Sequence, residues 1–252
     1  MATTPLDGRR MIVVGGSTGI GRGIADAWAA AGAEVVVCSR SEPAGPGAEL
    51  LTWARVDLTA PDHARERLRE LGAGPVDAAC FSSIYYGVKR ANFGDVAEQE
   101  WRDQLEINVT GLWLTLSAVL PALRVAAPGL FVGVSSEVVF NAGPGRSGYT
   151  ASKAAAKALL DSVAQEEDSA LVRIVQVLPA GMVDSPGIRR RRPPDFDYGS
   201  YMVPSDFARL ATELAVTAGE KYHGDSLVVD GQGDWWSALD SAPVSQSRPV
   251  RT

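Results

Sequence analysis

The sequence has little cysteine and little excess of positive charge, and each shortage excludes a class of protein. It holds two cysteines in 252 residues, too few for a disulfide scaffold. Cys38 and Cys80 lie in apolar runs, so we expect buried thiols and no metal site. Lys and Arg number 24 against 30 Asp and Glu, and the resulting net charge of −6 disfavours nucleic acid or an anionic membrane as a partner.

Long hydrophobic runs are also lacking. No stretch approaches the roughly 18 apolar residues of a membrane helix. The first apolar run, Met11–Val14, is shorter than the apolar region of a signal peptide. We therefore expect a cytoplasmic protein that does not enter a membrane.

Short β-branched runs alternate with helical patterns, which predicts an α/β fold with a parallel sheet and helices on both faces. Several of the expected strands are apolar throughout, as strands buried on both faces are. Strands are expected at 10–14, 34–38, 53–56, 78–81, 130–134, 173–178 and 226–229. Helices are expected at 19–31, 62–71, 98–124, 149–165 and 205–217, the last with Ser205 as its N-cap. We expect a single domain, residues 1–236, with a lid loop at about 184–204 and a loose tail at 237–252.

The first expected strand runs into a glycine-rich loop and then a helix. The loop reads Gly15-Gly16-Ser17-Thr18-Gly19-Ile20-Gly21. Its glycines let the backbone turn sharply and approach a pyrophosphate, to which the helix N-terminus offers free N–H groups and a positive dipole end. The spacing is G-x-x-x-G-x-G, and no Gly-Lys-Ser/Thr of a Walker loop follows. The alternative is a tight turn without a ligand.

The end of the second expected strand bears on the choice of cofactor. An NAD site places a carboxylate about 20 residues past the glycines, whereas an Arg there suits the 2′-phosphate of NADP(H). Arg40 lies 19 residues after Gly21 and no acid precedes it at the strand end, so we predict NADP(H). Alternatively, Arg40 is a solvated turn residue and Ser39 contacts the ribose. Asp57 is either an acceptor for the adenine amino group or a cap or turn residue.

A Tyr and a Lys stand four residues apart in Tyr149-Thr150-Ala151-Ser152-Lys153. On a helix the two share a face, and a nearby ammonium lowers the phenol pKa from its ordinary value of about 10. Such a pair suits a general acid or base acting on a carbonyl or alcohol oxygen. The spacing is common by chance, so the alternative is a surface Tyr beside a solvated Lys.

Two further polar residues sharpen this interpretation. Ser136 follows the fifth expected strand, 13 residues before Tyr149, where open α/β sheets bind ligands. Asn108 lies inside the long expected helix, where Asn is unfavourable because it competes with the backbone. A buried Asn satisfied by the backbone is the alternative.

The glycine loop, Asn108, Ser136, Tyr149 and Lys153 together resemble the short-chain dehydrogenase/reductase family, in particular its NADP-dependent ketoreductases. The similarity runs from about residue 8 to 235 and includes the ending Val229-Asp230-Gly231-Gln232-Gly233. It implies a single doubly wound Rossmann domain with a seven-stranded parallel sheet, nicotinamide-dependent hydride transfer, and homodimers or homotetramers. The chain departs from the family at Phe81-Ser82-Ser83-Ile84, where the family has Asn-Asn-Ala-Gly.

The resemblance also implies roles for individual residues. Tyr149 is the acid/base; Lys153 lowers its pKa and binds the nicotinamide ribose. Ser136 orients the carbonyl, and Asn108 holds a water that links Lys153 to a proton relay. The segment containing Ser82 lines the adenosine ribose. A segment beside the nicotinamide amide contributes Gly181, Val183 and Ser185.

The same resemblance places a substrate pocket near the lid. Its mouth is expected to hold Tyr85, Tyr86, Glu137, Val139 and Phe140, each of which is alternatively ordinary packing. The lid contains Arg189-Arg190-Arg191-Arg192, either a clamp for an anionic substrate or a solvated, mobile surface. Trp235 and Trp236 are expected to be apolar cover at a subunit contact, or else to touch the substrate.

The sequence thus predicts an NADP(H)-dependent ketoreductase or alcohol dehydrogenase acting on a small or medium-sized carbonyl or hydroxyl compound. One alternative is a dinucleotide-binding sensor or scaffold without turnover. Another is a dehydratase or epimerase of the same fold that retains its cofactor.

Overall fold

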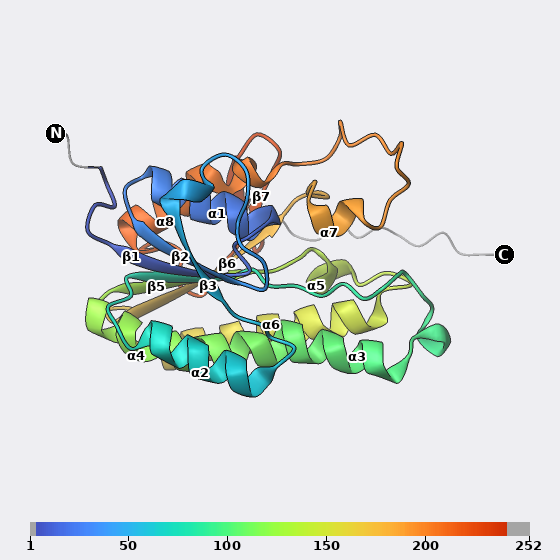
Figure 1. Ribbon diagram of the computed structural model, residues 1–252, viewed down its shortest axis with the longest axis horizontal. Coiled ribbons are helices and arrows are strands. Elements are labelled where there is room, and N and C mark those ends of the chain that lie inside the picture. Colours follow the sequence, from blue (N-terminus) through green and yellow to red (C-terminus); the bar gives the residue numbers. More distant parts are fainter. Residues whose placement is uncertain (1–3, 241–252) are drawn as a thin grey trace.

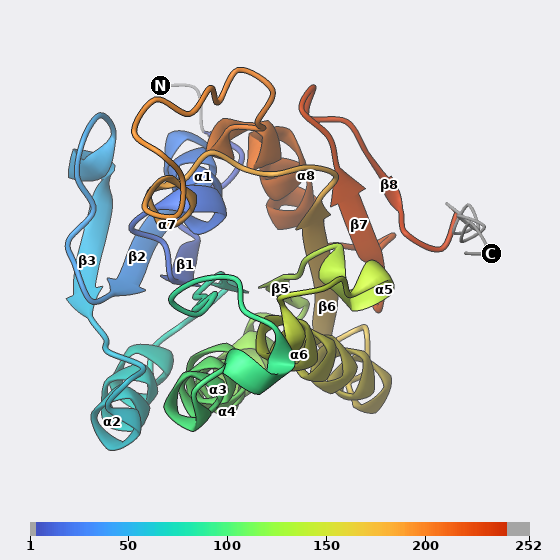
Figure 2. The same cartoon turned by 90° about the vertical axis from the view of Figure 1, so that its right-hand side faces the viewer.

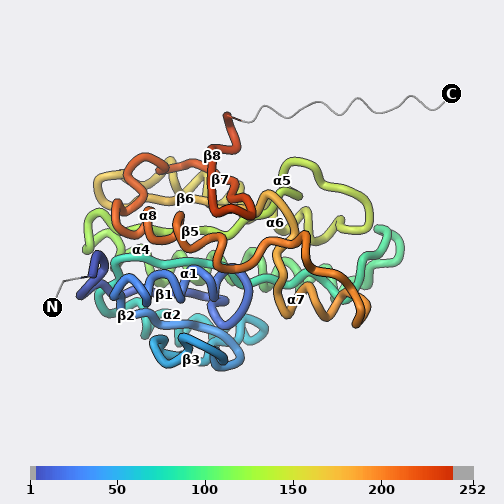
Figure 3. The backbone as a smooth tube through the Cα atoms, turned by 90° about the horizontal axis from the view of Figure 1, so that it is seen from above, coloured from blue at the N-terminus to red at the C-terminus, as the bar shows by residue number. Residues whose placement is uncertain are grey.

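The computed structural model describes residues 4–240, and eight strands among them form one sheet. The order is β3-β2-β1-β4-β5-β6-β7-β8, with β3 and β8 at the opposite borders (Figure 3). The first seven strands pair in parallel, which confirms the expected sheet. They are β1 (Arg10–Val14), β2 (Glu34–Ser39), β3 (Leu51–Arg55), β4 (Ala78–Phe81), β5 (Gly129–Val134), β6 (Val172–Pro179) and β7 (Ser226–Val229).

The eighth strand was not predicted. β8 (Trp235–Ser237) runs antiparallel to β7, and Trp236 pairs with Val228. The indole of Trp235 donates to the Tyr222 hydroxyl at 3.2 Å, so this side chain packs within its own subunit. Ser237, expected to begin the tail, ends this strand; the expected tail residues 241–252 lie outside the described range.

Helices cover both faces of the sheet (Figure 1). One face carries α1 (Gly19–Ala30) and α8 (Ala208–Thr217), and the other carries α2 (Pro61–Gly72), α4 (Gly111–Ala126) and α6 (Ser147–Glu166). The two cores follow from strand periodicity. In β1, Met11 and Val13 belong to the core under α1 and α8, whereas Ile12 and Val14 belong to the core on the other face.

The long helix expected at 98–124 forms with an internal irregularity. It consists of α3 (Glu98–Leu105), a π-helical turn (Glu106–Thr110) and α4. Within residues 4–240 it is the one helix long and apolar enough to cross a membrane. In α4, however, the apolar side chains of Leu112, Leu114, Leu116, Ala118, Val119 and Leu123 are buried in the protein. A π-turn often marks a functional site, and here it contains Asn108.

The segment 184–204, hereafter the lid, is partly ordered by a short helix. This helix, α7 (Pro186–Arg189), lies near α1, while α5 (Val138–Asn141) lies on the opposite side of the same edge (Figure 2). Ser205 does not form the N-cap that we expected for α8. The chain enters α8 through a 3-10 turn, Pro204–Phe207, where the Asp206 carboxylate accepts a hydrogen bond from the Val203 backbone at 2.8 Å.

Both cysteines are buried and free, as expected. Burial raises the pKa of Cys38 to about 12 and also raises that of Cys80. Thiolates are therefore scarce near neutral pH, and the two side chains serve as small apolar groups.

Candidate active site

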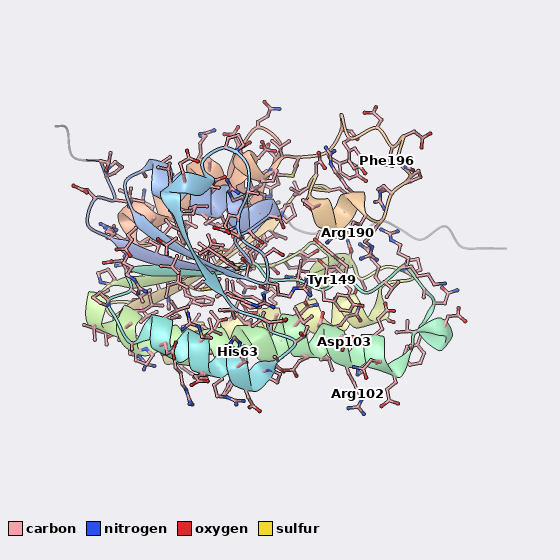
Figure 4. The ribbon with its side chains drawn as sticks, in the orientation of Figure 1. His63, Arg102, Asp103, Tyr149, Arg190 and Phe196 are labelled. Carbon is pink, nitrogen blue, oxygen red and sulfur yellow. The ribbon has the colours of Figure 1, made fainter. Side chains whose placement is uncertain are left out.

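The predicted site residues gather at the carboxyl edge of the parallel strands, where α/β sheets bind ligands. The glycine loop follows β1, Ser136 follows β5 and the segment 181–185 follows β6. Tyr149 lies at the start of α6, below the lid residues Arg190 and Phe196 (Figure 4).

The glycine loop is packed so tightly that side chains are excluded. A Cβ on Gly15, whose φ is +87°, would lie 2.4 Å from the backbone nitrogen of Ser83. A Cβ on Gly21 would lie 2.4 Å from the Gly15 carbonyl oxygen and 2.7 Å from the Ser82 Cβ. Ser82 and Ser83, where the chain departs from the family pattern, therefore form the wall behind the loop.

Helix α1 begins beside this loop with free backbone donors. Its N-cap, Thr18, makes no side-chain cap hydrogen bond, so the first N–H groups remain available to an anion. Thr18 is exposed, Ser17 is half-buried, and Ile20 packs on the core and fixes the first turn. The loop fits a pyrophosphate.

The adenine end of the site lies where β2 and β3 finish. Ser39 is buried, and its hydroxyl donates to the Ser41 carbonyl at 2.7 Å, whereas Arg40 is exposed. Asp57 accepts hydrogen bonds from the Thr59 backbone at 3.0 Å and from its hydroxyl at 2.7 Å. Asp57 is thus a turn residue, as one of the two interpretations expected. Its contact with adenine stays a prediction.

The charge of Asp57 is stabilised by its surroundings. Burial raises the pKa of this carboxyl, but the hydrogen bonds from Thr59 and the charges of Arg40 and Arg55 outweigh it and lower the pKa. Two guanidinium groups therefore act on this end of the site, which favours an anionic ligand there.

Tyr149 lies beside a short chain of polar groups. The Ser136 side chain lowers the pKa of the phenol, and the Ser136 hydroxyl donates to Glu137 Oε2 at 2.8 Å. Arg146 holds the other Glu137 oxygen at 3.2 Å. Because a serine hydroxyl has one proton, a substrate carbonyl must replace Glu137 as its acceptor before Ser136 can orient that carbonyl.

The pKa of Tyr149 shifts in the direction opposite to the one expected. Burial raises it well above its ordinary value, and Tyr86 and Glu137 raise it further, while Ser136 and Arg146 lower it. Lys153, expected to lower this pKa, does not contribute to the shift; its ammonium donates to the Val134 carbonyl at 2.7 Å.

Asn108 is held rigidly by three hydrogen bonds. Its amide nitrogen donates to the Tyr85 carbonyl at 3.0 Å and to the Ser152 hydroxyl at 2.9 Å. Its oxygen accepts from the Tyr85 backbone at 2.7 Å. Ser152 in turn donates to the Tyr149 carbonyl at 2.8 Å. Asn108 therefore joins the π-turn, the loop after β4 and helix α6, which supports the backbone-satisfied interpretation.

A small cavity lies behind Lys153. Its volume is about 10 Å³, and Asn108, Lys153 and Gln176 are among the residues that line it. This is close to the smallest space that holds one water. Within the described part of the chain, the buried Gln176 amide oxygen has no hydrogen-bond partner. The cavity is compatible with the expected water-mediated link between Asn108 and Lys153, which stays a prediction.

The expected pocket residues differ in how they contact Tyr149 and Ser136. The Tyr86 ring centre lies 5.1 Å from that of Tyr149, and Glu137 bonds Ser136 directly. Tyr85 takes part through its backbone. Phe140 is 57% exposed on α5, so its place in the pocket stays a prediction.

The segment after β6 joins the lid to the glycine loop. Val183 is buried and bridges to Met202, and exposed Gly181 precedes it. Ser185 caps α7 by accepting from the Ile188 backbone at 3.4 Å. A Cβ on Gly19 would lie 3.4 Å from the Ser185 Cβ, so Ser185 borders the loop.

Two of the lid arginines anchor it. Arg189 forms an ion pair with Asp184 at 2.5 Å and lies 4.7 Å from the Tyr198 ring centre. Arg192 donates to the Tyr201 hydroxyl at 3.1 Å. The aromatic residues of the lid contact one another edge to face: Phe196, Tyr198 and Tyr201.

The other two arginines face different surroundings. Arg190 is exposed, whereas Arg191 is half-buried with its guanidinium carbon 5.4 Å from the Tyr86 ring centre. One interpretation expected all four arginines to be solvated. This holds for Arg190 but not for Arg191.

Comparison with known proteins agrees with this geometry. The model of the short chain dehydrogenase family matches residues 9–194. The chain belongs to this family. It is therefore related to oxidoreductases, and its eight-stranded sheet keeps the expected Rossmann architecture.

Relatives of this short-chain dehydrogenase have different named activities. A 3-oxoacyl-(acyl-carrier-protein) reductase of Chlamydia muridarum is 27% identical over 87% of this chain and 95% of its own length. A 3-alpha-(or 20-beta)-hydroxysteroid dehydrogenase of Mycobacterium bovis is 30% identical over 90% of this chain and 89% of its own. A solved structure of a candidate NAD(P) dependent gluconate 5-dehydrogenase from Beutenbergia cavernae, with NADP bound at low occupancy, has a TM-score of 0.80 and 28% identity, covering 90% of this chain and 96% of that one.

Two residues of the candidate site were missed from the sequence. Ser152 bonds Asn108, and Arg146 bonds Glu137. Ser152 follows Tyr149 by three residues, a helical spacing that signals a shared region of α6. Arg146 gave no local signal.

Lys153 makes the stability of this dehydrogenase depend on pH. Burial lowers its pKa from 10.5 to about 8, against a smaller raising effect of Cys80. Between these values the unfolded chain binds more protons, so stability rises with pH. Below pH 8 the buried ammonium costs about 3 kcal/mol. Lys153→Met should therefore be more stable than wild type at pH 7, by an amount that shrinks towards pH 10.5.

Urea unfolding at several pH values measures this difference. Lys221→Met, at an exposed position, is the control and should show no such trend. A pH-independent difference for Lys153→Met would contradict the expectation.

Proposed function

We propose that this short-chain dehydrogenase is an NADP(H)-dependent carbonyl reductase or alcohol dehydrogenase. The carrying observation is that Tyr149, next to Ser136, lies at the strand edge that also presents the glycine loop and the free N-terminus of α1. That arrangement brings a proton donor and a dinucleotide cradle to one place.

The chain's residues divide the work. A bound nicotinamide supplies or accepts the hydride. Ser136 releases Glu137 and donates to the carbonyl oxygen, which fixes its orientation. Tyr149 gives its proton to that oxygen in reduction or takes one from the hydroxyl in oxidation. Proton transfer by a positioned side chain contributes about 10²–10⁴-fold in rate.

Lys153 and Asn108 support these steps. The Lys153 ammonium donates to the Val134 carbonyl, and its further N–H groups suit the nicotinamide ribose. Asn108 fixes the Tyr149 region through Ser152. Proton supply through the cavity beside Lys153 completes the proposal.

Arg40 supports the preference for NADP(H). It is exposed at the end of β2, and its charge acts on the same corner as that of Arg55. A guanidinium is suited to a 2′-phosphate. A structural neighbour with bound NADP also supports this preference.

Replacing Arg40 by Asp should weaken NADPH binding at least tenfold and bring the NADPH to NADH affinity ratio towards NADH. The carboxylate repels the 2′-phosphate and accepts from the 2′-hydroxyl instead. Fluorescence titration of the purified protein with both nucleotides measures the ratio. Arg102→Asp, which makes the same charge change on the exposed face of α3 (Figure 4), is the control. An unchanged ratio would contradict the NADP(H) assignment.

Net consumption of NADPH separates the reductase from its alternatives. A dehydratase or epimerase that retains its cofactor consumes none, and a sensor shows no turnover. We expect stoichiometric NADPH oxidation with a carbonyl substrate.

A further inference from the structure

Arg191 lacks a counter-ion where one is expected. Among the described residues, no carboxylate lies within ion-pair distance of it, whereas Arg189 pairs with Asp184 and Arg146 with Glu137. Yet Arg191 is half-buried, and burial lowers its pKa. A partly desolvated guanidinium without an anion is unfavourable, so the site favours an anionic partner.

The position of Arg191 points to the substrate pocket. Its guanidinium lies 5.4 Å from the centre of the Tyr86 ring, and that ring lies 5.1 Å from the Tyr149 ring. A single aromatic ring thus separates the cation from the catalytic phenol. An anion on Arg191 is therefore held one aromatic ring away from the phenol at which the carbonyl is proposed to react.

The lid fixes Arg191 in place. On one side Arg189 is tied to Asp184, and on the other Arg192 is tied to Tyr201. The cation–π contact with the Tyr86 ring leaves the N–H donors of the Arg191 guanidinium available. This planar fork matches the oxygens of a carboxylate or phosphate.

Neighbouring charges set where the anion can lie. Arg90 and Arg192 add positive charge around Arg191, and Glu100 opposes them. Glu137 stands beside Ser136, so a substrate anion next to the reacting carbonyl is repelled. The anion is accommodated at the opposite end of the molecule, several bonds from the carbonyl.

We propose that Arg191 binds an anionic end of the substrate, so that the substrates are carbonyl compounds carrying a carboxylate or phosphate several bonds from the carbonyl, or the corresponding alcohols. This inference rests on the proposed reductase activity and names its substrate class.

Matched substrates test the inference. With NADPH in excess, kcat and KM are measured for 5-oxohexanoate, its methyl ester and 5-oxohexyl phosphate. Wild type should favour an anionic compound over the ester, and the ratio of the two anions distinguishes carboxylate from phosphate. Arg191→Gln should raise KM for the favoured anion about 10- to 100-fold, the effect of losing a charge-assisted hydrogen bond, with kcat little changed and the ester unaffected.

Two further variants complete the design. Arg190→Gln replaces the exposed arginine next to Arg191 and should leave KM unchanged for all three compounds. Arg191→Lys keeps the charge without the fork and should give an intermediate KM; it also serves if Arg191→Gln does not fold in a thermal melt. Equal use of acid, phosphate and ester, or an equal effect of the Arg191 variants on all three, overturns the inference and leaves the reductase standing. If the protein reduces none of the three compounds and no compound of a neutral carbonyl panel, the proposed function is overturned and the inference with it.

Discussion

Tyr149→Phe is expected to lower kcat by about 10²–10⁴-fold while NADPH still binds. The substitution removes the hydroxyl that stands next to Ser136, the group proposed to hold the substrate oxygen. The Phe ring still packs on Tyr86, so the pocket keeps its shape. NADPH oxidation measures turnover, and nucleotide fluorescence measures binding.

The matched control for this variant is Tyr222→Phe, which removes a hydroxyl that bonds Trp235 on β8. It should keep full turnover. If Tyr149→Phe retained wild-type turnover, the proton donor would have to be another group. If the wild-type protein showed nucleotide binding but no turnover, a sensor would be the better description.

Gly21→Ala is expected to abolish tight NADPH binding. Its Cβ would lie 2.4 Å from the Gly15 carbonyl oxygen and 2.7 Å from the Ser82 Cβ. Neither neighbour is the end of a flexible side chain, so the loop backbone must move away from the position that cradles the pyrophosphate. A loss of tenfold or more in affinity, about 1.4 kcal/mol or more, should appear in a fluorescence titration.

Gly94→Ala provides the control, because a Cβ there meets nothing within 4 Å. It should bind NADPH as wild type does. A thermal melt of Gly21→Ala separates a displaced loop from a protein that has not folded. Unchanged affinity in folded Gly21→Ala would mean that the pyrophosphate does not bind at this loop.

The strands were predictable because they are buried on both faces. Runs such as Val35-Val36-Val37-Cys38 have no polar position, and that pattern holds whatever packs around it. β8 was not predictable, because three residues, Trp235–Ser237, carry no period and their pairing depends on β7.

The candidate site was predictable where chemistry and position coincide. Asn108 stands out as a polar residue in a helix interior, and the structure places it in a π-turn with all its amide groups bonded. The direction of the Tyr149 pKa shift was not predictable, since it depends on burial and on Tyr86, which only the fold brings together. The separate roles of the lid arginines likewise depend on aromatic partners. These lie nine residues away for Arg189 and Arg192, but Arg191 contacts Tyr86, from a distant part of the chain.

The contacts inside the lid have a consequence for binding entropy. Three aromatic rings and two arginines give this long connection a small core of its own. A disordered loop loses conformational freedom when it closes on a ligand, and that loss weakens affinity. Here the loss occurs during folding of the chain. The contacts that a substrate makes with the lid can therefore contribute to affinity, because little conformational entropy of the lid is lost on binding.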